Sequence, residues 1–280
     1  MNEASRRRLR QSLRLFAPEG HHARHPGRRQ PRSADNDCSD AHEVMASPDF
    51  RYRLKVDPYS SHSVILSRLG PGRGRRLLDV GTAQGEFARL LSQQGFTVTG
   101  IELDPQLAGH ARQTCTELVE VDLDRSIPEF RQPFDVIVYG DVLEHLKDPL
   151  LVFTGLNRYL APEGKAVVSV PNIAHIAIRL MLLFGYFEYM DRGILDRTHL
   201  RFFTLRSFRR FLAQAGMRVE EMVVTPVPLP LLFPPRWQGR MFQAVHCMNA
   251  LGARLSKRLL GYQFVAFGRL ETKRCAPRSL

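Results

Sequence analysis

Long apolar runs and clustered cysteines are both scarce in this sequence, and each shortage excludes a class of protein. The longest apolar candidate, Ile173–Phe187, is divided by Arg179, so no segment reaches the roughly 18–20 residues of a membrane span. The four cysteines, at positions 38, 115, 247 and 275, match neither a disulfide framework nor a metal-binding spacing. The sequence therefore predicts a soluble or peripheral protein in a reducing, cytosolic compartment, without a metal site.

Acidic residues are scarce in the last third of the chain. Residues 201–280 hold 14 Lys and Arg against three Asp and Glu, a net charge of +11, whereas the whole chain carries +12. A charge excess of this kind bears on the partner rather than on the fold. It keeps two partner classes open, nucleic acid and an anionic membrane surface.

Residues 1–44 lack the apolar periodicity of a folded segment. They contain Arg6–Arg8 and four histidines among several prolines. We expect a disordered tail, because such a composition buries too little apolar surface to offset the entropy of ordering. Two alternatives stay open. Residues 9–16 could form an amphipathic targeting peptide, and translation could start at Met45.

Residues 75–86 contain a strand, a glycine turn and the start of a helix, and the rest of the chain is organised around them. The apolar run at residues 77–80 is typical of a strand buried on both faces. It ends at Gly81, Gly85 follows, and helical spacing continues to Gln94. Since neither glycine has a Cβ, a cofactor could lie against the backbone at the helix N-terminus.

Two details of this turn argue against a dinucleotide. Ala83 replaces the middle glycine that admits a pyrophosphate, and Asp79 could meet a cationic amino group. Residues 77–85 resemble the first motif of class I S-adenosylmethionine-dependent methyltransferases. The resemblance covers about residues 50–270 and implies S-adenosylmethionine as cofactor. The implied contacts in the turn are Asp79, Gly81, Thr82, Ala83 and Gly85.

Strands alternate with helices through the rest of the chain. A helix is expected within residues 50–69, and Asp104, Asp148 and Thr204 stand where later helices would begin. The further expected strands cover residues 97–103, 117–121, 134–139, 165–170, 218–225 and 262–270. The last two alternate like an antiparallel pair. The pattern predicts a Rossmann-like, doubly wound α/β fold, with a seven-stranded sheet that is parallel except for one antiparallel strand.

Acidic residues stand at the ends of these strands. Glu102 ends the second strand, near the spacing from the glycine turn at which a carboxylate accepts both ribose hydroxyls. The resemblance implies that Asp122 meets the adenine amino group, with Leu123 beside the ring. Leu103 and Asp141 complete the expected cofactor site.

Two histidines are candidates for a base that removes the proton of an alcohol or phenol. His145 belongs to Asp141–His145, which is similar to the fourth motif of small-molecule methyltransferases, including those that methylate quinone precursors. His199 belongs to Asp196–Thr204, which resembles a signature of a subgroup found beside cell-surface glycan and lipid biosynthesis. A structural role is the alternative for each. Glu144 could orient His145 or face the cofactor.

The domain organisation follows from these assignments. Beyond the tail, residues 45–280 are expected to form one methyltransferase domain, with the cofactor-binding half at 76–172 and substrate-facing segments at 173–203 and 226–261. The segment 226–261 starts with a proline-rich apolar run and continues as a helix. Its apolar residues and arginines could rest in the interface of an anionic membrane, or the apolar residues could roof the substrate pocket.

The expected activity is O-methylation of a small or lipid-linked acceptor, of glycan, lipid or quinone type. A nucleic-acid methyltransferase would suit the charge. However, residues 139–142 are not the Asn/Asp-Pro-Pro-aromatic turn of amine-methylating enzymes, and no cysteine for ring-carbon methylation stands at a strand end. A non-catalytic cofactor-binding protein is the third possibility.

Overall fold

The structure, a computed structural model, describes residues 57–271, except for the side chain of Pro235, and these residues lie in one compact unit. The expectations for the tail, for a start at Met45 and for the helical pattern before residue 57 fall outside the described residues. Within them, no helix is both long and apolar enough to cross a membrane.

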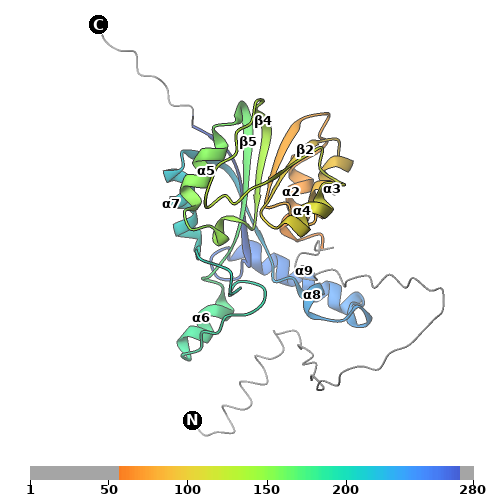
Figure 1. The fold of residues 1–280 in the computed structure, drawn as a ribbon. Coiled ribbons are helices and arrows are strands. Elements are labelled where there is room, and N and C mark those ends of the chain that lie inside the picture. Colours follow the sequence, from red (N-terminus) through yellow and green to blue (C-terminus); the bar gives the residue numbers. More distant parts are fainter. Residues whose placement is uncertain (1–56, 272–280) are drawn as a thin grey trace, which may run out of the picture. The chain divides into compact units, whose positions relative to one another are not determined.

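A seven-stranded sheet lies at the centre of the described part (Figure 1). Its strands are β1 (Arg76–Val80), β2 (Thr97–Glu102), β3 (Glu117–Glu120), β4 (Phe134–Gly140), β5 (Leu160–Pro171), β6 (Met217–Thr225) and β7 (Gln263–Leu270), in the order β3-β2-β1-β4-β5-β7-β6. Strand β7 runs antiparallel to both neighbours, and the other adjacent pairs are parallel. The predicted sheet, with its one antiparallel strand, is confirmed.

Helices cover both faces of the sheet (Figure 1). One face carries α2 (Ser61–Leu69), α3 (Glu86–Gln93) and α4 (Pro105–Ala111), and the other carries α5 (Pro149–Asn157) and α7 (Leu205–Gln214). Two hydrophobic clusters result. Ile65 and Leu91 pack with the strands on the first face, and Phe153 and Phe208 do so on the second. The core therefore lies in two layers that sandwich the sheet.

Local sequence sets where these helices begin. Asp104 and Asp148 accept hydrogen bonds from backbone N–H groups in the first turns of α4 and α5. Thr204 and Ser207 form a reciprocal capping box at the start of α7. Each cap satisfies N–H groups that have no partner within the helix. The expected starts of these three helices are confirmed.

A further group of helices lies where β5 and β6 end (Figure 1). It comprises α6 (Ile176–Leu183), α8 (Leu229–Leu232), the 3₁₀ turn η3 (Pro235–Trp237) and α9 (Arg240–Leu255). His246 of α9 is buried, and its Nε2 lies 3.2 Å from each carboxylate oxygen of Asp57. This contact ties α9 to the segment that precedes α2. The helix expected within 226–261 is present, although it begins after Trp237.

Candidate active site

Hydrogen bonds to Asp79 and to the backbone of β2 hold the glycine turn after β1. The Thr82 hydroxyl donates to the Asp79 carboxylate at 2.8 Å, and the N–H groups of Gly81 and Thr82 both donate to the carbonyl of Ile101. Burial raises the pKa of Asp79 to about 7; the Thr82 hydrogen bond lowers it, and the nearby charge of Glu102 raises it further. Among the described residues, no ion pair involves Asp79. A ligand cation beside it would therefore favour the ionised carboxylate.

Both glycines of the turn have a positive φ, 73° at Gly81 and 81° at Gly85. They differ in what an added Cβ would meet. A Cβ on Gly81 would lie 3.0 Å from Cγ2 of Val142, next to the end of β4. A Cβ on Gly85 would lie 2.2 Å from Oγ1 of Thr114 and 2.9 Å from Cα of Ala111. Packing against the end of α4 thus explains Gly85 without reference to a cofactor. Cofactor contact through its backbone stays a prediction.

Three backbone N–H groups hold the carboxylate of Glu102 at the end of β2. Oε1 accepts from Leu103 at 2.9 Å and Asp104 at 3.0 Å, and Oε2 accepts from Ala83 at 2.8 Å. A carboxylate offers about four lone-pair positions, so three are already in use. Binding both ribose hydroxyls therefore requires a shared hydrogen bond or the displacement of one N–H donor.

The residues predicted to meet the adenine differ in how available they are. Asp122 accepts from the N–H of Asp124 at 3.0 Å and pairs with Arg125 at 3.1 Å. Leu123 is 8% exposed and belongs to the core, whereas Leu103 is 61% exposed. Of the two leucines, only Leu103 exposes apolar surface at this edge, and contact with the adenine stays a prediction.

Backbone strain marks the ends of two neighbouring strands. Ala83 after β1 and Asp141 after β4 have φ values of 50° and 55°, a conformation that residues with a Cβ rarely adopt. The Asp141 carboxylate is fixed by the Ser169 hydroxyl at 2.6 Å and by Nε2 of Gln263 at 2.8 Å. Strain of this kind persists where surrounding contacts enforce it, and it is concentrated at functional sites.

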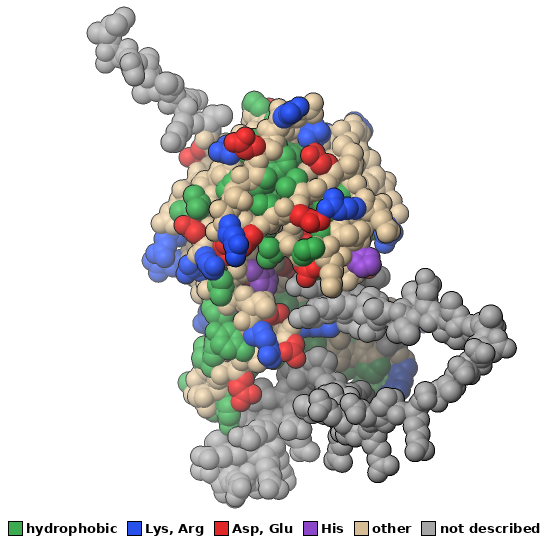
Figure 2. All heavy atoms as spheres, viewed as in Figure 1, with side chains coloured by type: hydrophobic (Ala, Val, Ile, Leu, Met, Phe, Trp, Pro, Cys, Tyr) green, Lys and Arg blue, Asp and Glu red, His purple; other side chains and the backbone are tan. Residues whose placement is uncertain are grey.

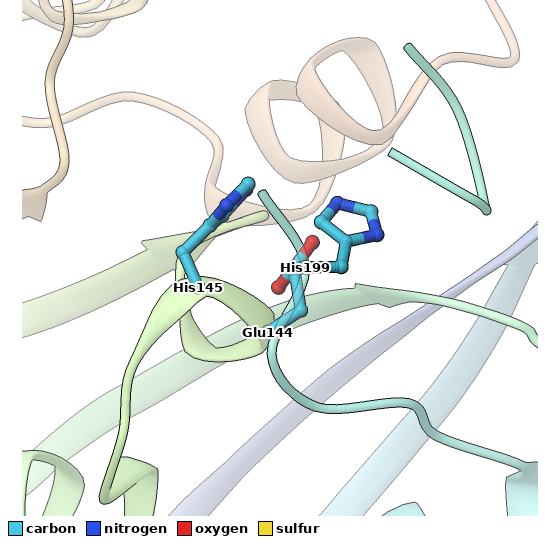
Figure 3. A group of neighbouring side chains, drawn as sticks. All are labelled: Glu144, His145 and His199. Carbon is cyan, nitrogen blue, oxygen red and sulfur yellow. The ribbon is translucent and has the colours of Figure 1, made fainter. Parts of the chain in front are cut away.

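Directly beyond Asp141, the structure brings both candidate histidines together with Glu144. Glu144 and His145 lie in the 3₁₀ turn η2 (Leu143–His145), and His199 lies in the loop before α7. One potential ligand atom from each side chain lies within 4.8 Å of the other two. Figure 3 shows the carboxylate of Glu144 beside the two imidazoles. We call these three residues the Glu–His–His cluster.

Main-chain hydrogen bonds hold the two halves of the cluster together. The N–H groups of Leu200 and Arg201 donate to the backbone carbonyl of Glu144 at 2.8 and 2.9 Å. Glu144 and His199 are both buried, and His145 is half-buried. The loop before α7 is thus docked onto the turn after β4, which fixes the distance between the histidines.

The hydrogen bonds also assign the tautomer of each histidine. Nδ1 of His199 lies 3.1 Å from the carbonyl of Ile194, which can only accept. The Thr198 hydroxyl donates to Asp196 at 2.7 Å, so its oxygen accepts from Nδ1 of His145 at 3.0 Å. The proton of each neutral ring therefore sits on Nδ1, and each Nε2 carries a lone pair.

Burial keeps both rings neutral near pH 7. It is the largest cause that lowers the pKa of His145 and of His199 below the usual 6.5. The neighbouring His199 lowers the pKa of His145 further, while hydrogen bonds to the backbone oppose both shifts. Two neutral imidazoles with Nε2 lone pairs can accept protons or bind a cation.

Comparison with known proteins gives the family. A family model described as a methyltransferase domain matches residues 58–222, more than half of the chain. The chain belongs to this methyltransferase family. The matched residues begin before α2 and end in β6. They therefore include the carboxyl ends of β1, β2 and β4 and the Glu–His–His cluster.

Relatives of this methyltransferase domain agree with the assignment. A ubiquinone biosynthesis O-methyltransferase of Xylella fastidiosa is 31% identical over 165 residues, 56% of this chain and 66% of that protein. The chain thus spans just under two thirds of that relative's length.

Solved structures share the fold. An S-adenosylmethionine-dependent methyltransferase of Mesorhizobium loti matches with a TM-score of 0.52 and 18% identity, over 75% of this chain and 98% of that one. A possible histamine N-methyltransferase of Thermotoga maritima matches with a TM-score of 0.51 and 17% identity, over 76% and 89%. The resemblance to class I methyltransferases is confirmed at the level of family and fold.

The residues of this methyltransferase domain fit S-adenosylmethionine, the cofactor that the family assignment supports. The buried carboxyl of Asp79, with its raised pKa, suits a ligand ammonium. Glu102 and Leu103 stand at the end of the adjacent strand, where a ribose and a base would follow. When bound, this cofactor supplies an electrophilic methyl group on a sulfonium. The individual contacts stay predictions.

Sequence reasoning missed the role of Glu144 as a third member of the cluster. Its place in the chain allowed two orientations, toward His145 or toward the cofactor. The deciding signal is long-range, because the loop that carries His199 docks on the backbone of Glu144. The pattern Glu-His together with a later Thr-His would have been the only local hint.

Proposed function

We propose that this methyltransferase transfers the methyl group of S-adenosylmethionine to an oxygen of a small or lipid-linked acceptor, of quinone-precursor, glycan or lipid type. The observation that carries the proposal is the Glu–His–His cluster beyond Asp141, at the end of β4. The Xylella fastidiosa relative is an O-methyltransferase of ubiquinone biosynthesis by name, which supports an oxygen acceptor of quinone type. We infer that the glycine turn after β1, the turn after β4 and the loop before α7 meet around the transferred methyl group.

The proposed reaction is an in-line displacement. The acceptor hydroxyl loses its proton to Nε2 of His145 or His199, and its oxygen attacks the methyl carbon as the carbon–sulfur bond breaks. The sulfur keeps that electron pair and leaves as the thioether S-adenosylhomocysteine. Positioning the reactants accounts for up to roughly 7–11 kcal/mol of such a barrier, and a base adds about 10²–10⁴-fold. The neutral, oriented histidines suit that role.

The proposed cofactor position runs across the ends of three strands. The amino-acid part lies beside Asp79 and the turn of Gly81, Thr82, Ala83 and Gly85. The ribose lies at Glu102, and the adenine lies between Leu103 and the segment of Asp122 and Leu123. In this arrangement the sulfonium lies near Asp141, which directly follows β4, the strand beside β1. The cluster is then on the acceptor side.

We also propose that α8 and α9 attach the protein to an anionic membrane. Large apolar side chains are exposed along one side of this segment: Leu231, Trp237, Met241, Val245, Met248, Leu251 and Leu255. Their spacing of three or four residues on α9 makes a stripe opposite its buried His246 and Ala250. Arg236, Arg240 and Arg254 are exposed beside it.

A second apolar surface lies at the same end of the sheet and supports membrane contact through that end. Figure 2 shows hydrophobic side chains gathered over α6. Leu182, Leu183 and Phe184 are among the exposed residues there. Since α6 follows β5 and α8 follows β6, both surfaces lie at the end where the cofactor is proposed to bind. An acceptor dissolved in a bilayer would thus approach the reactive end directly.

Methyl transfer to defined acceptor classes tests the proposed function. The full chain is incubated with S-adenosylmethionine labelled in its methyl group and with catechols and phenols, with and without a prenyl tail, beside amines and transfer RNA. We expect acid-stable label in the hydroxylated acceptors and matching release of S-adenosylhomocysteine. Label in RNA or amines instead would favour the nucleic-acid alternative. Cofactor binding without any transfer, including to lipid and glycan extracts, would favour the non-catalytic one.

A further inference from the structure

We infer that the Glu–His–His cluster holds one divalent transition-metal cation, with Zn²⁺ as the type case, and that the acceptor oxygen binds to this cation. The donor set is a carboxylate oxygen of Glu144 and the Nε2 atoms of His145 and His199. Two of these donors come from the turn after β4 and the third from the loop before α7. The cation's role in catalysis rests on the proposed function, whereas its binding does not.

The separation of the donor atoms suits one cation. Zn–N and Zn–O bonds are about 2.0–2.2 Å long, so tetrahedral ligand atoms on one ion lie about 3.3–3.6 Å apart. One ligand atom from each of the three side chains lies within 4.8 Å of the other two. Side-chain rotations that move these atoms by about 1 Å therefore bring all three into bonding distance.

The surroundings of both histidines match those of metal ligands. A ligating imidazole normally donates its other N–H to a carbonyl, a carboxylate or a similar acceptor, which fixes the ring and the tautomer. Nδ1 of His199 does so to Ile194, and Nδ1 of His145 does so to Thr198, which is itself bonded to Asp196. The second layer of the site is therefore already built.

The donor types select the class of ion. Imidazole nitrogen suits Zn²⁺, Fe²⁺ and related ions, whereas Mg²⁺ and Ca²⁺ prefer sites made of oxygen alone. Three protein ligands leave at least one coordination position open, as in catalytic zinc sites. His145 is only half-buried, whereas Glu144 and His199 are buried. We place the open position, and the acceptor oxygen, on the side of His145.

A cation here changes how the acceptor loses its proton. The bound hydroxyl becomes more acidic, its O–H bond breaks, and the proton passes to solvent. The resulting oxyanion then attacks the methyl carbon, and the sulfur leaves with the electron pair of the broken bond. In this version His145 and His199 hold the metal, and the metal orients the acceptor oxygen and stabilises its negative charge. Neither histidine accepts the proton itself.

Zinc content per chain tests the inference without cofactor or acceptor. The full chain has four further histidines near its N-terminus, so the measurement uses a background in which His21, His22, His25 and His42 are asparagine. This protein is stripped with a chelator, exposed to Zn²⁺, dialysed and analysed for metal. We expect one retained Zn²⁺ per chain. Replacement of Zn²⁺ by Co²⁺ should give a visible ligand-field spectrum typical of nitrogen and oxygen donors.

Three conservative variants locate the ion. Glu144→Gln, His145→Gln and His199→Gln should each weaken Zn²⁺ binding more than tenfold, and His110→Gln, on the exposed side of α4, should leave it unchanged. Each variant is checked by circular dichroism, and any one that folds decides the matter. Loss of the Zn²⁺ on dialysis, or retention that is unaffected in a folded variant, would overturn the inference. Methyl transfer by a metal-stripped chain would refute the catalytic role of the cation and leave the proposed function standing. Zinc binding without any methyl transfer would refute the proposed function and leave the metal site standing.

Discussion

The imidazoles of His145 and His199 lie edge to face with their ring centroids 4.7 Å apart. They come from two distant segments, which are joined by the hydrogen bonds of Leu200 and Arg201 to the backbone of Glu144. Because the backbone makes these bonds, the side chains can be changed while the two segments stay docked. The pair can therefore be tested by substitution.

Removal of either imidazole is expected to slow methyl transfer. Whether the rings take the proton or hold a cation, His199→Ala and His145→Ala should each lower kcat by about 10²–10⁴-fold. The affinity for S-adenosylmethionine should stay within about twofold, since neither ring belongs to the proposed cofactor contacts. Steady-state kinetics with titration calorimetry measure both, and His110→Ala serves as the matched control. Unchanged kcat in both variants would leave positioning as the whole mechanism.

Cofactor affinity should depend on pH through Asp79. Burial raises its pKa in the free protein to about 7, so the carboxyl is largely protonated at pH 6 and must ionise to pair with the cofactor ammonium. Affinity should therefore rise with pH through 7, with a loss of up to about tenfold for each pH unit below. Calorimetry in buffers of different ionisation enthalpy should detect the released proton.

The control for this linkage is Asp79→Asn, which removes the titrating group and keeps the size of the side chain. It should bind more weakly at pH 8 and show a flatter pH dependence. The free energy of unfolding changes with pH in the opposite direction to the cofactor affinity. Because the pKa in the folded state is raised, the stability that this group contributes is complete at low pH and is lost as pH rises through 7. An affinity that is unchanged between pH 6 and 8 would contradict the placement of the ammonium.

The strands and the helix starts were predictable because each follows a local rule. Buried parallel strands such as 134–139 are nearly continuous apolar runs, broken here only by Asp135, and caps such as Asp104 and Thr204 mark where helices start. The residues expected at strand ends lie there because parallel strands share one carboxyl edge. Fold and cofactor edge thus follow from short stretches of sequence.

The cluster and the surfaces were not predictable in this way. The third member, Glu144, depends on the docking of a loop that follows more than fifty residues later, at Leu200 and Arg201. The need for glycine at position 85 depends on Thr114, which is close in space but distant in sequence. The apolar residues of α9 have helical spacing whether they face inward or outward, and only the burial of His246 on the other side shows which.

Gly85 and Gly109 form a matched pair for testing the packing explanation. Gly85→Ala would force a Cβ into Thr114 and Ala111 at a positive φ, and should lower the free energy of unfolding by about 2–4 kcal/mol. Gly109→Ala lies within α4 with no atom within 4 Å of the added Cβ, and should raise it by up to about 1 kcal/mol. Denaturant unfolding measures both. Equal effects would show that packing does not constrain Gly85.

Vesicle flotation tests the proposed attachment of α8 and α9. Binding should appear with anionic lipid and fade with salt, because each basic residue near such a surface contributes about 1 kcal/mol. The triple variant Met241→Ser, Met248→Ser and Leu255→Ser should lose it, since these side chains are mostly exposed and lie outside the core. Leu151→Ser, which is 61% exposed and lies on α5, is the control. Absence of flotation at low salt would end the proposal.

The most direct measurement for the whole account is a crystal structure of the full chain with S-adenosylhomocysteine. The account predicts the amino group beside Asp79, the ribose at Glu102, the adenine against Leu103, and the sulfur facing Asp141 and the Glu–His–His cluster. The sulfur should lie close enough to the cluster for an acceptor oxygen to fit between them. A ligand bound away from the ends of β1, β2 and β4, or with its sulfur turned from the cluster, would contradict it.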